Sequence, residues 1–207
     1  MEQSSDLPAV ADQRELEQDG PGQGSQVAPP GVWPVFTDAR FSLLLRHWAE
    51  GRKGIATPRD AIDPAAIKSC LPHVYMFRFR AEDGSFICTL AGEKVSEAWG
   101  HAMIGRQPQD FMPAASAATA LAIYRRIVTE PAVHVGHRPI TPRVLPEKAA
   151  DRLVVPLTWP DGRPWGMLGL SIYHYNPVTQ AGHPPHVGPD VTYFPCVALP
   201  PDLPPAP

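Results

Sequence analysis

Residues 103–112 read Met-Ile-Gly-Arg-Gln-Pro-Gln-Asp-Phe-Met, and the order of the elements on either side of this stretch decides the fold. Before it, residues 74–100 carry two strand patterns and a short helix. After it, residues 116–129 carry the apolar spacing of an amphipathic helix. Three further strand patterns then follow, at 132–138, 152–158 and 164–174. This order predicts an α+β domain, with a small antiparallel sheet and its helices gathered on one face.

The first two strands are expected to form a hairpin with an aromatic inner face. Tyr75, Phe77 and Phe79 alternate with residues that point the other way, as they would in an extended strand. Asp83-Gly84 supplies the turn to the second strand. The short helix that follows ends at Trp99, with Gly100 at its C-terminal cap.

Upstream of the sheet, residues 37–73 are predicted to form flanking helices. Thr37 or Asp38 is a suitable N-cap, and a helical apolar face follows it. The face consists of Phe41, Leu44, Leu45 and Trp48, and Gly51 and Gly54 end the helix. A second, shorter helix is expected over 64–71. The apolar face has two interpretations: it covers the domain's own sheet, or it is an interaction surface that a dimer would bury.

The two ends of the chain are predicted to lie outside the domain. Residues 1–36 have few large apolar side chains, so a packed core could not offset the entropy of ordering them. The last 31 residues contain ten prolines, which favours an extended, solvated tail over 176–207. As an alternative, Tyr193 and Phe194 anchor part of this tail on the domain. The predicted domain is therefore 37–175, with its core at 74–175.

Charge and cysteine content limit the partners and the compartment. The formal charge of −3 is spread along the chain without a basic stripe, which argues against nucleic acid and anionic membrane. Three widely spaced cysteines fit a reducing compartment. The sequence has neither a signal-peptide pattern nor an apolar run of about 18 residues. We therefore expect a soluble, cytoplasmic protein of bacterial type.

Taken together, residues 74–174 resemble PAS domains, whose five-stranded antiparallel sheet has the order 2-1-5-4-3 with helices over one face. Gly105-Arg106 followed by Phe111 is similar to the glycine-basic-apolar signature between the early and long helices of that family. The upstream segment resembles a PAS subgroup with extra N-terminal helices that is common in alphaproteobacteria. The matching upstream positions are Trp48, Gly51, Pro58-Arg59, Ile62-Asp63-Pro64, Ile67 and Leu71-Pro72.

The resemblance implies a signalling module that binds a small ligand inside a cup or dimerises through its flanking helices. The tails are too short for an output module, so the response is expected to reach a separate partner protein. The candidate cup residues are Phe77, Phe79, Trp99, Arg106, Tyr124, His137 and Met167. Among them, Arg106 and His137 are candidates for contacting an anionic ligand. The competing interpretation is that the aromatic residues simply fill the core.

Cofactors are disfavoured individually, and the ligand is left unknown. Flavin-binding PAS relatives place a reactive cysteine near 107–112, where this chain has none. Haem-binding relatives take a histidine from the long helix, and 116–129 contains none, although His134 and His137 on the next strand leave haem as a minor option. A metal site at His183, His186 and Asp190 is disfavoured because the prolines between them hold the chain extended.

An enzyme is also disfavoured, because the sequence has no nucleophile elbow, phosphate-binding glycine loop, zinc-protease motif or close cysteine pair. A small enzyme with convergent acid and base residues is kept as a minor alternative. The main alternative to a sensor is a ligand-free interaction or dimerisation adaptor. In either case we expect a homodimer.

Overall fold

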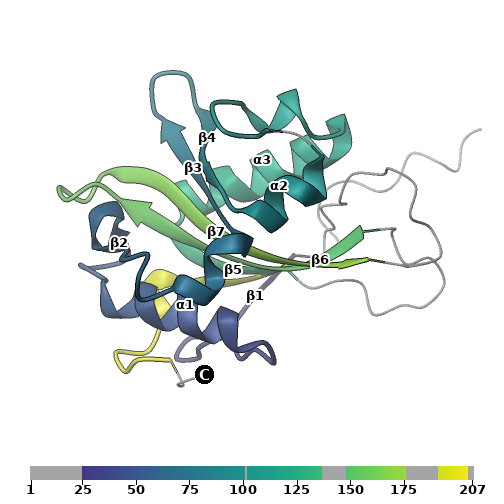
Figure 1. Cartoon of the computed structure of the whole chain (residues 1–207). Helices are drawn as coiled ribbons and strands as arrows, with labels where there is room; N and C mark the ends of the chain where they lie inside the picture. Colours follow the sequence, from purple (N-terminus) through teal and green to yellow (C-terminus); the bar gives the residue numbers. More distant parts are fainter. Residues whose placement is uncertain (1–24, 101, 137–147, 176–190, 205–207) are drawn as a thin grey trace, which may run out of the picture.

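The computed structural model describes residues 25–100, 102–136, 148–175 and 191–204 (Figure 1). Its helices are α1 (Ala39–Glu50), α2 (Glu93–Trp99) and α3 (Ala114–Thr129). Short 3-10 helices are η1 (Arg59–Ala61), η2 (Lys68–His73), η3 (Pro108–Asp110) and η4 (Cys196–Ala198). The strands are β1 (Ser25–Val27), β2 (Thr57–Pro58), β3 (Val74–Arg80), β4 (Ser85–Ala91), β5 (Ala132–Gly136), β6 (Lys148–Thr158), β7 (Pro164–Tyr175) and β8 (Val191–Pro195).

The strands of the described residues join in one sheet of the order β1-β8-β5-β6-β7-β3-β4, and β2 pairs with β6 beside this path. The strands within the expected core are neighbours in the order β4-β3-β7-β6-β5, all antiparallel. The sheet is larger than the five strands expected, because β8 and β1 extend it past β5. It is also mixed, since β1 pairs with β8 and β2 with β6 in parallel.

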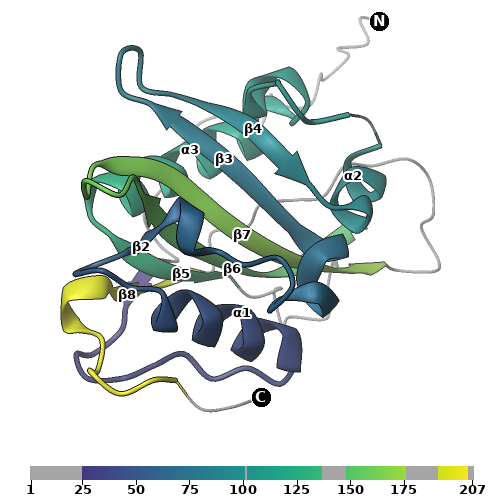
Figure 2. The same ribbon diagram turned by 60° about the vertical axis from the view of Figure 1, so that its left-hand side comes forward.

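Helices cover both faces of the sheet: the core helices α2 and α3 lie on one face, and the flanking helix α1 lies on the other (Figure 2). The helices α2 and α3 pack on the face that carries the alternate side chains of β3, including Tyr75 and Phe77. The opposite face carries Val74 and Met76, and α1 packs there. The first part of β3, residues 74–77, is apolar on both sides because it lies between two cores, whereas Arg78 and Arg80 further along the strand are exposed.

The helix α1 is part of the second core, not an interaction surface. Asp38 is its N-cap, accepting a hydrogen bond from the backbone of Arg40, and Gly51 is its C-cap. Its apolar face is fully buried against the sheet, through Phe41, Leu44, Leu45 and Trp48. The Trp48 indole nitrogen also donates to the carbonyl of Pro156 on β6, at 2.8 Å. The hypothesis that a dimer buries this face is therefore wrong, because the domain's own sheet already covers it.

The segment after residue 190 was expected to be a tail, but residues 191–195 form β8 within the sheet. Strand β8 pairs with β5, and Tyr193 is only 4% exposed. Further along, the carbonyls of Asp202 and Pro204 accept hydrogen bonds from Trp33 and Arg46, at 2.8 and 3.0 Å. The prolines do not prevent this docking, because the hydrogen bonds use carbonyls, which proline retains. Residues 176–190 and most of the expected N-terminal tail lie outside the described residues.

One local prediction needed adjustment. The helix expected over 64–71 is the 3-10 helix η2, which begins at Lys68 and contains Pro72. The stretch that begins at Met103 forms a turn with Gly105 at a φ of 83°, a conformation that favours glycine. This turn pairs with β4, because the backbone nitrogens of Gly105 and Cys88 donate to the carbonyls of Cys88 and Arg106.

No helix among the described residues combines the length and apolar character needed to cross a membrane.

Candidate functional site: a polar-lined cup

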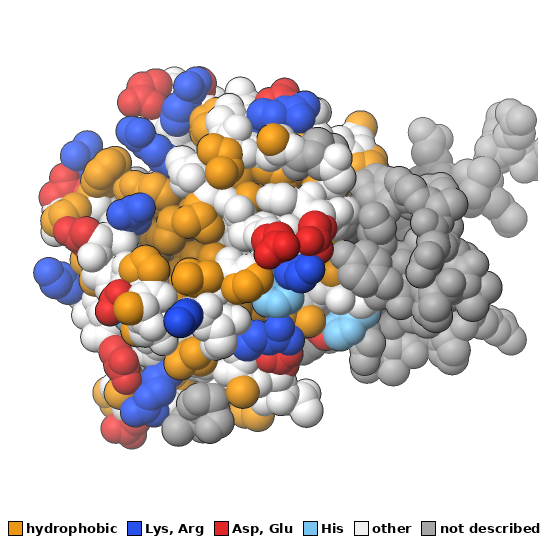
Figure 3. All heavy atoms as spheres, viewed as in Figure 1, with side chains coloured by type: hydrophobic (Ala, Val, Ile, Leu, Met, Phe, Trp, Pro, Cys, Tyr) orange, Lys and Arg blue, Asp and Glu red, His pale blue; other side chains and the backbone are white. Residues whose placement is uncertain are grey.

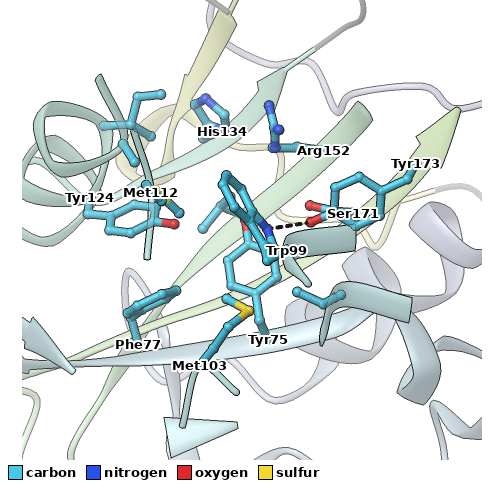
Figure 4. Close-up of a pocket in the computed structure, with 14 residues that line it drawn as sticks. Tyr75, Phe77, Trp99, Met103, Met112, Tyr124, His134, Arg152, Ser171 and Tyr173 are labelled. Carbon is cyan, nitrogen blue, oxygen red and sulfur yellow. Dashed lines mark hydrogen bonds between the residues drawn. The ribbon is translucent and has the colours of Figure 1, made fainter. Parts of the chain in front are cut away.

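A small cavity lies between the sheet and the helices α2 and α3 (Figure 4). Its apolar lining comes from Phe77, Val95, Met103, Met112, Ala120, Ile123 and Val154. Seven further lining residues carry polar groups: Tyr75, Trp99, Tyr124, His134, Arg152, Ser171 and Tyr173. So many polar groups around one cavity in an apolar core identify this cup as the candidate site.

The sheet positions these polar groups by its alternation. On β7, Ser171 and Tyr173 are two residues apart, so both point to the cup side. Arg152 on β6 lies directly opposite Ser171 in the register, and His134 comes from the next strand, β5. Residues between them, such as Leu153 and Leu170, point into the second core.

Gly169 makes room for the ring of Tyr75 on the floor of the cup. The two residues are direct partners between β7 and β3. A Cβ atom at Gly169 would lie 2.1 Å from Cζ of Tyr75, far inside contact distance. The glycine therefore lets the phenol lie across the sheet, with its hydroxyl near the polar groups of β7.

A hydrogen bond ties helix α2 to the sheet at one side of the cup. The Trp99 indole nitrogen donates to the Tyr173 hydroxyl at 3.1 Å (Figure 4). Trp99 also packs edge-on against Phe111, with ring centroids 5.8 Å apart. This pair of side chains therefore links α2 to β7 at the edge of the cup.

Two phenols of the cup, those of Tyr75 and Tyr124, are kept neutral and act as hydrogen-bonding groups. Burial raises the pKa of Tyr75 to about 12, although the nearby positive charge of Arg152 acts in the opposite direction. Burial also raises the pKa of Tyr124 well above its usual value. Both hydroxyls consequently keep their protons at neutral pH and can donate to a bound acceptor.

Ser171 has the least satisfied hydroxyl of the set. Its side chain is 1% exposed, and its Oγ has no hydrogen-bond partner of normal geometry among the residues described. It lies near enough to the Tyr75 hydroxyl to lower that group's pKa, but the two do not meet the geometry of a full hydrogen bond. A buried hydroxyl left in this state costs about 1–3 kcal/mol, which a bound molecule would recover.

The free space in the cup is small. The region that the centre of a water molecule can reach is about 20 Å³. This is room for about one or two waters, or for a chemical group of that size. In this conformation the cup would not admit a flavin or a haem, whose ring systems need pockets of several hundred Å³.

Three of the predicted cup residues, Phe77, Trp99 and Tyr124, do line the cavity. Met167 belongs to the same buried cluster without lining it, and Phe79 packs against Phe86 at the cluster's edge. Arg106 does not line the cup: its guanidinium donates to the carbonyls of Ala102 and Asp110. His137 lies outside the described residues.

Sequence reasoning did not select four of the polar lining residues, namely Tyr75, Arg152, Ser171 and Tyr173. A signal for two of them was present, because Ser171 and Tyr173 are the polar residues of a period-two pattern that continues from Met167. The strand alternation places Tyr75 on the same inner face as Phe77, but it does not by itself place the phenol in the cup.

The described residues contain no group of three or more His, Cys, Asp or Glu that could hold a metal ion. The sequence motif at His183, His186 and Asp190 lies outside them. The residue types of the cup are also unlike a metal site, because its lining, over the described ranges, has one histidine and no carboxylate or cysteine.

A second, open hollow lies on the surface where the β3–β4 and β6–β7 hairpins end. Arg78 stacks over the Trp159 ring at 5.6 Å, and Arg163 lines the same hollow. Figure 3 shows apolar side chains interspersed with basic ones on this side of the molecule. Its arginines are largely compensated, because Arg80 and Arg163 pair with Asp83 and Asp161.

The mixed sheet, the helices over its cup and the polar lining define a class of small α+β binding modules. A family model described as the PAS domain matches residues 38–172, so the chain belongs to the PAS domain family. No curated protein matches the chain. PAS domains are in general sensory or regulatory modules and are usually not catalytic, which places the chain in this broad functional class.

Proposed function

We propose that the protein is a non-enzymatic sensory PAS module that binds a small ligand in its cup and acts on a separate partner protein. We also propose that it belongs to the PAS subgroup with extra N-terminal helices that is common in alphaproteobacteria. The presence of α1 and η2 ahead of β3, within the matched range, supports this assignment. Cytoplasmic location and homodimerisation remain part of the proposal.

The observation that carries the proposal is the convergence of polar groups on one buried cavity. A cup that served only as a core would be filled by apolar side chains, since each polar group buried without a good partner is costly. Here Tyr75, Tyr124 and Ser171 bring three buried hydroxyls from different elements to the same space. Such an arrangement is typical of ligand sites, where a few polar groups fix the orientation of the ligand.

The route by which a signal would leave the cup is short. A ligand among these hydroxyls would lie beside Tyr173, which holds Trp99 of α2 by a hydrogen bond. Any shift of Tyr173 would loosen or strengthen this attachment of α2. We therefore propose that the outer surface of α2 reports the state of the cup to the partner.

Native mass spectrometry of freshly purified protein tests the proposal. The expected spectrum contains the chain plus a small additional mass that is lost on denaturation. As a control, Ser171→Leu fills the cup with an apolar side chain and should remove the additional mass. A protein that carries no bound molecule, and binds none from a library of metabolites, would overturn the sensory proposal.

One observation favours the alternative of a ligand-free adaptor. With room for one or two waters, the cup is nearly filled, as it would be if only the surface of the module functioned. The two functions predict different behaviour for Ser171→Leu: a sensor loses its response in cells, whereas an adaptor that folds normally keeps its partner and its activity.

A further inference from the structure

The chemistry of the cup indicates the class of ligand. We infer that it binds the carboxylate group of a small organic acid, with Arg152 as the cation and the hydroxyls of Ser171, Tyr75 and Tyr124 as donors. This inference rests on the proposed function, because it specifies the ligand of the same cavity.

Charge is the first argument. Among the residues that the structure describes, the lining contains an arginine and no aspartate or glutamate. Arg152 is a partly buried residue, and its positive charge acts on both Tyr75 and Tyr124. In a partly buried site such a charge is screened far less than at the surface, so it favours an anion over a neutral or cationic ligand.

The donors are the second argument. Neutral phenols and a serine hydroxyl can each donate a proton to an oxygen that carries negative charge, and such bonds are stronger than those between neutral groups. The buried Ser171 Oγ, which has no well-formed hydrogen bond among the described residues, faces this space. An incoming carboxylate oxygen would therefore satisfy a donor that the protein itself leaves open.

Size is the third argument. The space of about 20 Å³ corresponds to about one or two waters. The two oxygens of one carboxylate replace two waters, whereas a phosphate or sulfate, with four oxygens, requires more room. The cavity therefore selects a planar carboxylate over a tetrahedral anion of higher charge.

Sodium acetate, with acetamide as its neutral counterpart of the same shape, tests the inference. The readout is the indole N–H resonance of Trp99 in ¹⁵N-labelled protein, identified by its loss in Trp99→Phe. We expect acetate to shift this resonance in a saturable way, with sodium chloride of equal ionic strength giving no such shift. Acetamide should bind at least about tenfold more weakly, because it lacks the charge that strengthens the hydrogen bonds.

Variants assign the effect to the cup. Arg152→Met and Ser171→Ala should each weaken acetate binding by about tenfold or more. Arg152→Lys keeps the charge and should retain part of the affinity. The matched control is Arg125→Met, which removes an exposed arginine of α3 and should leave binding unchanged. Unfolding midpoints of all variants establish that they are folded.

The inference is overturned if acetate and acetamide bind equally, if acetate does not bind, or if Arg152→Met and Ser171→Ala bind acetate as the wild type does. Its failure can be separated from that of the proposed function. If the protein does not bind acetate but carries a neutral molecule that Ser171→Leu removes, the inference of a carboxylate ligand is wrong and the sensory proposal stands. If the protein does not bind acetate and neither carries nor binds any other small molecule, both the carboxylate inference and the sensory proposal are wrong.

Discussion

Substitution of Gly169 by alanine tests the floor of the cup. The added Cβ would lie 2.1 Å from Cζ of Tyr75 and 2.5 Å from its Cε2 and hydroxyl oxygen. Since carbon atoms pack at about 3.5–4 Å, the ring must move by more than about 1 Å. Gly169 does not have a positive φ, so alanine introduces no backbone strain of its own.

The expected loss of stability follows from this clash. Forcing an extra carbon into a packed core costs about 1–3 kcal/mol. Because the 2.1 Å contact is so close, the cost is expected in the upper part of this range, at about 2–3 kcal/mol. Alanine recovers about 1 kcal/mol by restricting the unfolded chain, which leaves a net loss of about 1–2 kcal/mol. For a chain of this size, that loss corresponds to a fall in Tm of about 2–8 °C.

Urea unfolding of a double-mutant cycle is the assay. Leucine at position 75 lacks the two ring carbons and the hydroxyl oxygen that the alanine Cβ would meet, so Gly169→Ala should cost at least about 1 kcal/mol less in the Tyr75→Leu background. Gly136→Ala is the matched control, because the added Cβ would lie 3.3 Å from its nearest neighbour, Cε1 of the His134 ring. This substitution should therefore lower the free energy of unfolding by less than Gly169→Ala does. An equal cost of Gly169→Ala in both backgrounds would refute the proposed position of the Tyr75 ring.

Three further predictions concern the rest of the fold. Leu45→Ala should lower the free energy of unfolding by about 2–5 kcal/mol in urea, because Leu45 is fully buried in the second core; a loss below about 0.5 kcal/mol would contradict that burial. Tyr193→Ala should cost about 3 kcal/mol, since the ring is buried and Arg126 lies over it at 4.0 Å, whereas the exposed Val197→Ala should be near neutral in the same assay. Burial and the adjacent Arg40 lower the pKa of His73, so the unfolded state binds the proton more tightly than the folded state does. The free energy of unfolding should therefore fall as the pH drops below 6.5. The variant His73→Gln should reduce the dependence of the urea midpoint on pH in this range, and an unchanged dependence would contradict the role of His73.

The local elements of the domain follow from its sequence because their signals are local. The alternation of Tyr75, Phe77 and Phe79, the turn at Gly84 and the cap at Gly100 each depend on a few neighbouring residues. The same is true of Asp38 and Gly51 at the ends of α1.

The second core and the strand β8 depend on contacts between distant parts of the chain. The apolar face of α1 has the same pattern whether it covers a sheet or a partner, and only the presence of Met76 and Leu170 on the opposite face decides between them. Strand β8 was obscured by the prolines around it, although Val191 and Tyr193 alternate as buried strand residues do.

The cup was only partly predictable for a similar reason. Phe77, Trp99 and Tyr124 were selected because aromatic residues signal a core, whereas Ser171 and Arg152 look like ordinary surface residues in sequence. Their position in the cup depends on the register of β7 against β6, which places them opposite each other. Register is set by pairing across the sheet and has no signature in either strand alone.

A high-resolution crystal structure of the protein grown with sodium acetate tests the central claim most directly. The account predicts planar, three-armed density between Ser171 Oγ, the phenols of Tyr75 and Tyr124, and the Arg152 guanidinium. A cup that contains only a water molecule, or that closes by collapse of its own side chains, would contradict it.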